Sequence, residues 1–253
     1  MRVTRCFLAH VLCSFLLLPW ATTSSARSLH WFGEVEDIEL ATWPPYCKAR
    51  ASAFEEKNST IRLVSTTEKE RWQRYFGQTF QHLHHYCKGL LWQLRAGRPS
   101  WIARHNYPLS FILGQVPAEF YYTWTKLPPT HRMYGKMGAD LLLAYQDAGD
   151  PDAAKRIMND LLSVKPHDRY TYTGAADFYR KQGNRNKAIE MLEQSAGKVR
   201  KNGAILADLA QDYYDLKEYE KSREYARLAR SKGLKLVRLG KELEKVGFPI
   251  TGK

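Results

Sequence analysis

The sequence lacks the motifs that mark common classes of enzyme. It has no phosphate-cradling glycine-rich loop, no Gly-x-Ser-x-Gly nucleophile motif and no Cys-x-x-Cys-His haem-attachment motif. Its carboxylates are scattered among basic residues, and side chains such as Asp177 and Asp208 are expected to be solvated charges and not acid/base pairs. These absences predict a binding protein, not an enzyme, and one that uses no cofactor.

The sequence has no apolar run as long as a membrane span, and its longest apolar run lies at the start of the chain. Arg2 and Arg5 precede an apolar run from Cys6 to Leu18, and small residues follow up to Ala26. This order is typical of a secretory signal peptide, and the run is shorter than the ~20 residues of a membrane span. We expect residues 1–26 to be removed after export to the periplasm or the medium. An uncleaved membrane anchor is the less favoured alternative.

Cysteine is scarce, and only two of the four cysteines lie beyond this leader. Cys47 and Cys87 form an even pair in a chain that we expect to be exported, which favours a disulfide over two free thiols. A bridge closing a loop of this length stabilises the fold by roughly 4 kcal/mol in the chain-entropy model.

Tryptophan is missing from the second half, because all seven tryptophans lie at or before Trp124. The mature chain therefore divides into an aromatic-rich region, 27–127, and an alanine- and lysine-rich region that begins near residue 135. Pro128 and Pro129 separate them, since proline interrupts a helix. The net charge of +13 favours anionic partners, and export makes nucleic acid an unlikely one.

The second half has a register of 34 residues, which is the period of a helix-turn-helix repeat. Aromatic, small and turn residues recur together at this spacing, as packing and helix termination require. The sets are Tyr145, Tyr179 and Tyr213; Ala154, Ala188 and Ser222; and Gly149 and Gly183, with Lys217 at the third turn.

These residues resemble the tetratricopeptide repeat. The resemblance implies an all-α fold, a right-handed α-solenoid with units at 135–168, 169–202 and 203–236 and a capping helix with a tail at 237–253. The region 27–127 is expected to be helical, with a possible degenerate repeat. Its Trp-Pro-Tyr-Cys and His-His-Tyr-Cys segments ahead of such units are similar to those of a group of exported bacterial proteins, a similarity that implies no activity.

In this family the first helix of each unit lines a groove where peptides bind, so the resemblance implies a scaffold or adaptor for a protein or peptide partner. The groove residues carried over by position are Lys136, Leu143, Gln146, Tyr170, Thr173, Asp177, Arg180, Gln211 and Tyr214. The alternative is that these are solvated side chains without a ligand. A second functional hypothesis is a basic module that binds an anionic polysaccharide or a membrane surface. Nothing in the sequence indicates the oligomeric state.

A histidine-rich segment offers a third hypothesis, metal binding by His82, His84 and His85. His82 and His85 share a helix face, and Cys87 would add a thiolate if it were reduced. No recognised zinc motif is present, so we favour a structural role. Tyr46, Trp72, Tyr86 and Trp92 are expected to form an aromatic cluster over the disulfide.

Overall fold

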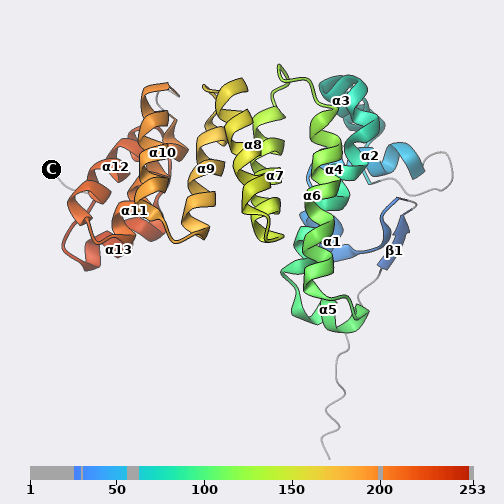
Figure 1. The fold of residues 1–253 in the computed structure, drawn as a ribbon, viewed down its shortest axis with the longest axis horizontal. Helices are drawn as coiled ribbons and strands as arrows, with labels where there is room; N and C mark the ends of the chain where they lie inside the picture. Colours follow the sequence, from blue (N-terminus) through green and yellow to red (C-terminus); the bar gives the residue numbers. More distant parts are fainter. Residues whose placement is uncertain (1–25, 30, 56–62, 199–201, 251–253) are drawn as a thin grey trace, which may run out of the picture.

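The computed structural model of the protein describes residues 26–29, 31–55, 63–198 and 202–250, so most of the predicted leader lies outside the described residues. Most of the described chain is helical, and the later helices follow one another across the molecule in chain order (Figure 1). The helices of the first half are α1 (Asp37–Thr42), α2 (Pro45–Glu55), α3 (Thr66–Phe76), the 3-10 helix η1 (Gly77–His82), α4 (Leu83–Ala96), α5 (Pro99–His105) and α6 (Leu109–Thr125). Those of the second half are α7 (Tyr134–Asp147), α8 (Pro151–Val164), α9 (Arg169–Lys181), α10 (Arg185–Lys198), α11 (Gly203–Asp215), α12 (Tyr219–Ser231) and α13 (Val237–Lys245).

The all-α class is confirmed, with one departure at the start of the described chain. Strands β1 (Ala26–Leu29) and β2 (Gly33–Glu36) form an antiparallel hairpin in which Arg27 pairs with Val35. The expectation that this segment is helical was wrong. Leu29 and Val35 are buried, and Gly33 takes the positive φ of 67° that the tight connection needs.

The helix ends of the second half repeat one geometry. Helices α7, α9 and α11 end at Asp147, Lys181 and Asp215, and each end lies 34 residues after the one before it. After each end one residue is left-handed, and the N–H of the next residue donates to a tyrosine carbonyl, as in a Schellman-type helix terminus. The left-handed residues are Gly149, Gly183 and Lys217, and the donor and acceptor pairs are Asp150 and Tyr145, Asn184 and Tyr179, and Glu218 and Tyr213.

Small residues let the helices approach closely. A Cβ on Gly174 of α9 would lie 2.7 Å from the Cβ of Ala139 on α7, so the two backbones meet there. Ala154, Ala188 and Ser222 are fully buried. Ser222 replaces the alanine without cost because its hydroxyl donates to the carbonyl of Ala210 at 2.7 Å.

The last helix covers the end of the stack. Leu239 and Leu243 of α13 are buried against Ala210 and Ala226, and Leu236 packs beside them. These leucines recur at intervals of three and four residues, as on one side of an amphipathic helix.

The break between the two halves is where the prolines predict it, because α6 ends at Thr125 and α7 begins at Tyr134. Helix α3 ends at Phe76, because Gly77 adopts φ 54° and begins the 3-10 helix η1. None of the helices in the described ranges is long and apolar enough to cross a membrane.

Candidate partner-binding surface

The nine residues predicted for the groove lie on α7, α9 and α11, which supply three, four and two of them. All nine are half-buried, so none belongs to the core and none is fully exposed. We call this set the α7–α9–α11 surface: Lys136, Leu143, Gln146, Tyr170, Thr173, Asp177, Arg180, Gln211 and Tyr214.

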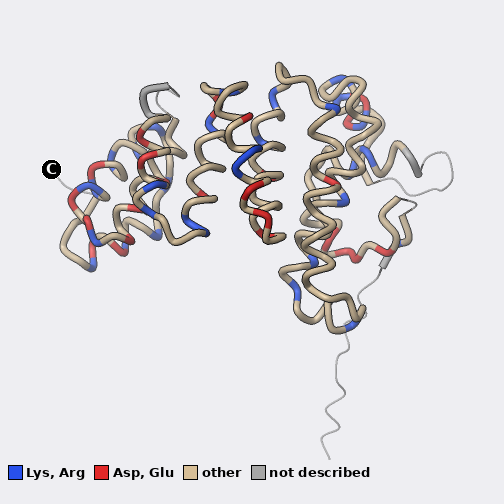
Figure 2. Tube along the Cα trace, viewed as in Figure 1, with Lys and Arg blue, Asp and Glu red and all other residues tan. Residues whose placement is uncertain are grey.

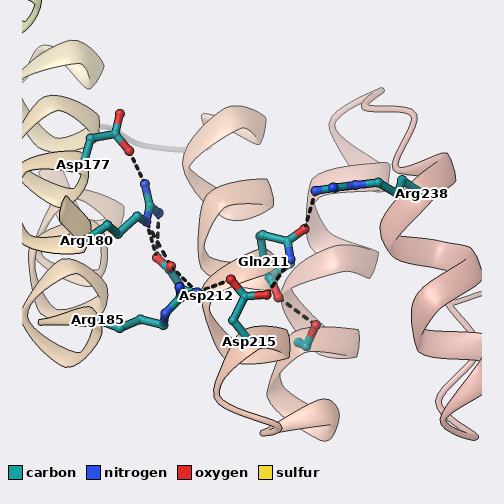
Figure 3. A network of polar contacts seen from close by, with 9 residues as sticks. Asp177, Arg180, Arg185, Gln211, Asp212, Asp215 and Arg238 are labelled. Carbon is teal, nitrogen blue, oxygen red and sulfur yellow. Dashed lines mark hydrogen bonds and ion pairs between the residues drawn. The ribbon is translucent and has the colours of Figure 1, made fainter. Parts of the chain in front are cut away.

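Arg180 joins α9 to α11 across this surface (Figure 3). Its guanidinium donates to the carboxylate of Asp212 at 2.6 and 2.9 Å and to that of Asp177 at 2.5 Å. Asp212 is 1% exposed, so its charge is stabilised almost entirely by this contact. Arg180 and Asp177 are therefore internal partners and are not free to reach a ligand.

The network continues towards the C-terminal end of the stack (Figure 3). Arg185 forms ion pairs with Asp215 and, at 3.5 Å, with Asp212. Gln211 donates to Asp215 at 2.8 Å and accepts from Arg238 at 3.3 Å. Gln211 thus holds α11 and α13 together in addition to facing the surface.

Asp208 stands apart from these pairs. Burial raises the pKa of its carboxyl to about 6, and the charges of Asp177 and Asp212 add to that effect while Arg180 opposes it. No hydrogen bond or ion pair to Asp208 is found in the described part of the chain. Helix α11 therefore carries, outside the nine residues of the surface, a carboxylate whose ionised form is destabilised by burial, where the sequence predicted an ordinary solvated charge.

Lys136 is held in a second cluster, where the first half of the chain meets α7. Its ammonium contacts both carboxylate oxygens of Asp140, at 2.7 and 2.6 Å. Asp140 also accepts from the hydroxyl of Tyr86, a residue of α4 whose pKa is raised by its complete burial. Asp140, which the sequence analysis did not single out, is the residue that joins α4 to α7.

The remaining members of the surface offer aromatic and amide groups. The Tyr170 ring lies under the guanidinium of Arg169, 4.4 Å from the ring centroid. Tyr214 packs on Tyr219 with ring centroids 5.5 Å apart. The Oε1 atom of Gln146 is buried without a protein hydrogen-bond partner, so only the rest of this amide side chain faces the surface.

The disulfide between Cys47 and Cys87 is present, as predicted. Both residues are fully buried, and the bond ties α2 to α4. Tyr46, Trp72 and Tyr86 gather near it, with Tyr46 5.6 Å from Trp72 and 6.4 Å from Tyr86 between ring centroids. The bridge indicates an oxidising compartment.

Trp92 does not join that cluster, and this part of the prediction was wrong. Its ring packs instead at 6.2 Å from Trp101, 6.0 Å from Tyr107 and 6.3 Å from Phe111. Trp92 comes five residues after Cys87 on α4, which places it on another side of that helix.

The three histidines bond to different partners, although the rings of His84 and His85 lie 4.3 Å apart between centroids. The Nδ1 atom of His85 lies 2.6 Å from the Glu119 carboxylate, that of His82 lies 3.2 Å from the Tyr122 hydroxyl, and that of His84 faces the Gln81 carbonyl. Burial lowers the pKa of His84 to about 4. Among the described residues no group of three or more His, Cys, Asp or Glu side chains could hold a metal, and Cys87 is oxidised.

A buried ion-pair cluster fixes the hairpin and α1 to α4 and α5, and the sequence analysis missed it. Glu39, fully buried, accepts from Arg95 at 2.9 Å and from Arg98 at 3.2 Å. Glu36 accepts from Arg98 at 2.6 Å and from Arg104 at 2.9 Å. These partners are 56 to 68 residues apart in sequence, too far for any local pattern to reveal.

No protein-family model and no curated protein sequence matches the chain. The structure alone defines the class: a predominantly helical, repeat-like protein with one disulfide among its described residues.

Proposed function

We propose that this protein is an exported tetratricopeptide-repeat scaffold that binds a protein or peptide through its α7–α9–α11 surface. The observation that carries the proposal is the recurrence of one helix end at 34-residue spacing. The left-handed residue and the tyrosine carbonyl that accepts a hydrogen bond recur at equivalent positions of all three helix pairs. A period of 34 residues in helix pairs is the signature of that repeat.

Export is part of the proposal. The apolar run and the small residues before Arg27 support a cleaved signal peptide, and the disulfide supports an oxidising destination. Cleavage after Ala26 would leave Arg27 as the first residue, still opposite Val35 in the hairpin.

The chemistry of the surface favours a peptide over a small charged ligand. The ion pairs of Arg180 and Lys136 are satisfied within the chain, so they hold the helices in place and do not supply free charge. Tyr170 and Tyr214 are left as aromatic anchors. Aromatic anchors of this kind dominate the energy of protein interfaces.

The test is affinity capture from envelope extract of the source cells, with wild type and a Tyr170→Ala, Tyr214→Ala double variant. A matched control carries Val164→Ala and Leu228→Ala, two exposed apolar residues on α8 and α12. We expect wild type and control to recover the same partner and the tyrosine variant to lose it. Recovery of identical proteins by all three would remove the α7–α9–α11 surface as the binding site.

A further inference from the structure

Helix α6 exposes apolar and aromatic side chains along its outer side. Five large apolar side chains of α6 and the segment leading into it are between 38% and 47% exposed. We call them the α6 face: Tyr107, Phe111, Tyr121 and Tyr122 on one side of the helix, together with Leu109, which is exposed at the helix start. Gly114 and Ala118, which lie between them on the helix, are exposed as well, so no charged side chain interrupts the stripe.

The other outer helices look different. In Figure 2 the tube of α6 is almost entirely tan, the colour of residues without a charge, whereas α8 carries several acidic and basic residues. The exposed positions of α8 include Asp152, Lys155, Arg156 and Asp160, and those of α12 include Glu220, Lys221, Glu224 and Arg227. The single charged residue of α6, Glu119, is turned to His85 and Lys88. An apolar stripe on one outer helix of several marks an interaction surface.

The lower end of the α6 face is held in a fixed arrangement. The rings of Tyr107 and Phe111 are stacked with centroids 5.5 Å apart, and Tyr107 is stacked on Trp101 at 5.9 Å. Trp92 packs edge-on against Tyr107 and Phe111. These contacts order the exposed rings before any partner arrives, which lowers the entropic cost of binding.

The sequence around α6 is basic. From Glu70 to Asp140 it has nine Lys and Arg residues and three Asp and Glu residues, a net charge of +6, and six of the nine cations form ion pairs within the chain. Glu36 and Glu39 pair with the arginines beside α5, but Arg104 remains half-exposed. Lys126, which follows directly after α6, is exposed and lies over the Tyr122 ring.

We propose that the α6 face docks on the surface of an anionic phospholipid bilayer. Tyrosine and phenylalanine side chains settle at the level of the headgroups, and flanking cations attract the acidic lipids. A second copy of the chain is a poorer occupant, because two chains that each carry a net charge of +13 repel one another. The face lies on α6, apart from the α7–α9–α11 surface, so docking there does not depend on the proposed peptide binding.

The experiment is co-sedimentation of the mature chain with vesicles of phosphatidylcholine alone and with vesicles that also contain phosphatidylglycerol. A Leu109→Ser, Phe111→Ser variant removes two side chains that are 46% and 45% exposed. The matched control, Val164→Ser with Leu228→Ser, removes two that are 44% and 42% exposed elsewhere. Circular dichroism checks the fold, and a Tyr121→Gln variant probes the other end of the face.

Wild type and control should sediment with the anionic vesicles and much less with the neutral ones. The Leu109 and Phe111 variant should partition on the order of tenfold more weakly, as expected for the loss of two inserting apolar side chains. Tyr121→Gln should weaken binding by a smaller factor. The proposal is overturned if wild type sediments with neither kind of vesicle. It is overturned as well if the Leu109 and Phe111 variant and the control bind the anionic vesicles equally. It is also overturned if ultracentrifugation shows a dimer that the Leu109 and Phe111 variant abolishes, because the face is then a self-interface.

Discussion

Replacing Arg180 by methionine should destabilise the fold by about 2–4 kcal/mol. The side chain donates to the carboxylates of Asp212 and Asp177, and Asp212 is 1% exposed. Removing one partner of a buried pair leaves an uncompensated charge and typically costs about 3–5 kcal/mol. The Arg180 side chain is itself 22% exposed, and Arg185 stays 3.5 Å from Asp212, so we expect a loss about 1 kcal/mol below that range.

Urea unfolding followed by circular dichroism measures this loss. An unchanged slope of the unfolding free energy against urea concentration would show that variant and wild type expose the same surface on unfolding. An Arg180→Met, Asp212→Leu double variant should recover most of the stability, because no lone charge then remains buried. Arg156→Met, an exposed arginine on α8, should change stability by less than about 0.5 kcal/mol. A loss below about 1 kcal/mol for Arg180→Met would refute the claim that this arginine is a structural partner.

Three further outcomes follow from particular residues. Lys217→Gly should stabilise the protein by about 0.5–1 kcal/mol in urea unfolding, since Lys217 has φ 63°, whereas Gly183→Lys should destabilise it by about 1 kcal/mol without any steric clash. Asp208→Asn should stabilise the protein by about 2 kcal/mol at neutral pH, because the pKa of Asp208 is raised to about 6 in the folded state and its ionised form is therefore destabilising. This gain should shrink as the pH falls through 6 towards the pKa of the carboxyl in the unfolded chain. Cys47→Ser with Cys87→Ser should lower the free energy of unfolding by roughly 4 kcal/mol, measured against wild type under oxidising conditions, and an equal loss in wild type on adding reductant would support the same origin.

What the sequence predicted well depends on short-range patterns. The turn residues Gly149 and Gly183 predicted helix ends, and the structure has the same left-handed turn even at Lys217. The disulfide followed from counting, since Cys47 and Cys87 are the only two of the four cysteines that lie after residue 26.

What the sequence did not reveal depends on contacts between distant segments. Arg180 and Asp212 are 32 residues apart, and Glu39 and Arg95 are 56 apart. Each looks in isolation like one more charge on a helix face. The hairpin was missed because four-residue strands are too short for a reliable alternation of apolar and polar residues.

The candidate site was predicted only as a set of positions. The resemblance to the tetratricopeptide repeat implied Thr173, Asp177 and Arg180 by position, and all three are half-buried on α9. Position in a repeat could not distinguish the side chains that pair internally, such as Arg180, from those left open, such as Tyr170 and Tyr214. That distinction requires the neighbouring helix, because Asp212 on α11 decides the role of Arg180.

Site-specific photocrosslinking tests the central claim, partner binding at the α7–α9–α11 surface, most directly. A photoreactive side chain at Thr173, half-buried on α9, is compared with the same side chain at Asn159, exposed on the outer side of α8. Irradiation in source cells should give a discrete adduct of defined mass from position 173 and none from position 159. Adducts from position 159 alone, or the same products from both positions, would contradict the account.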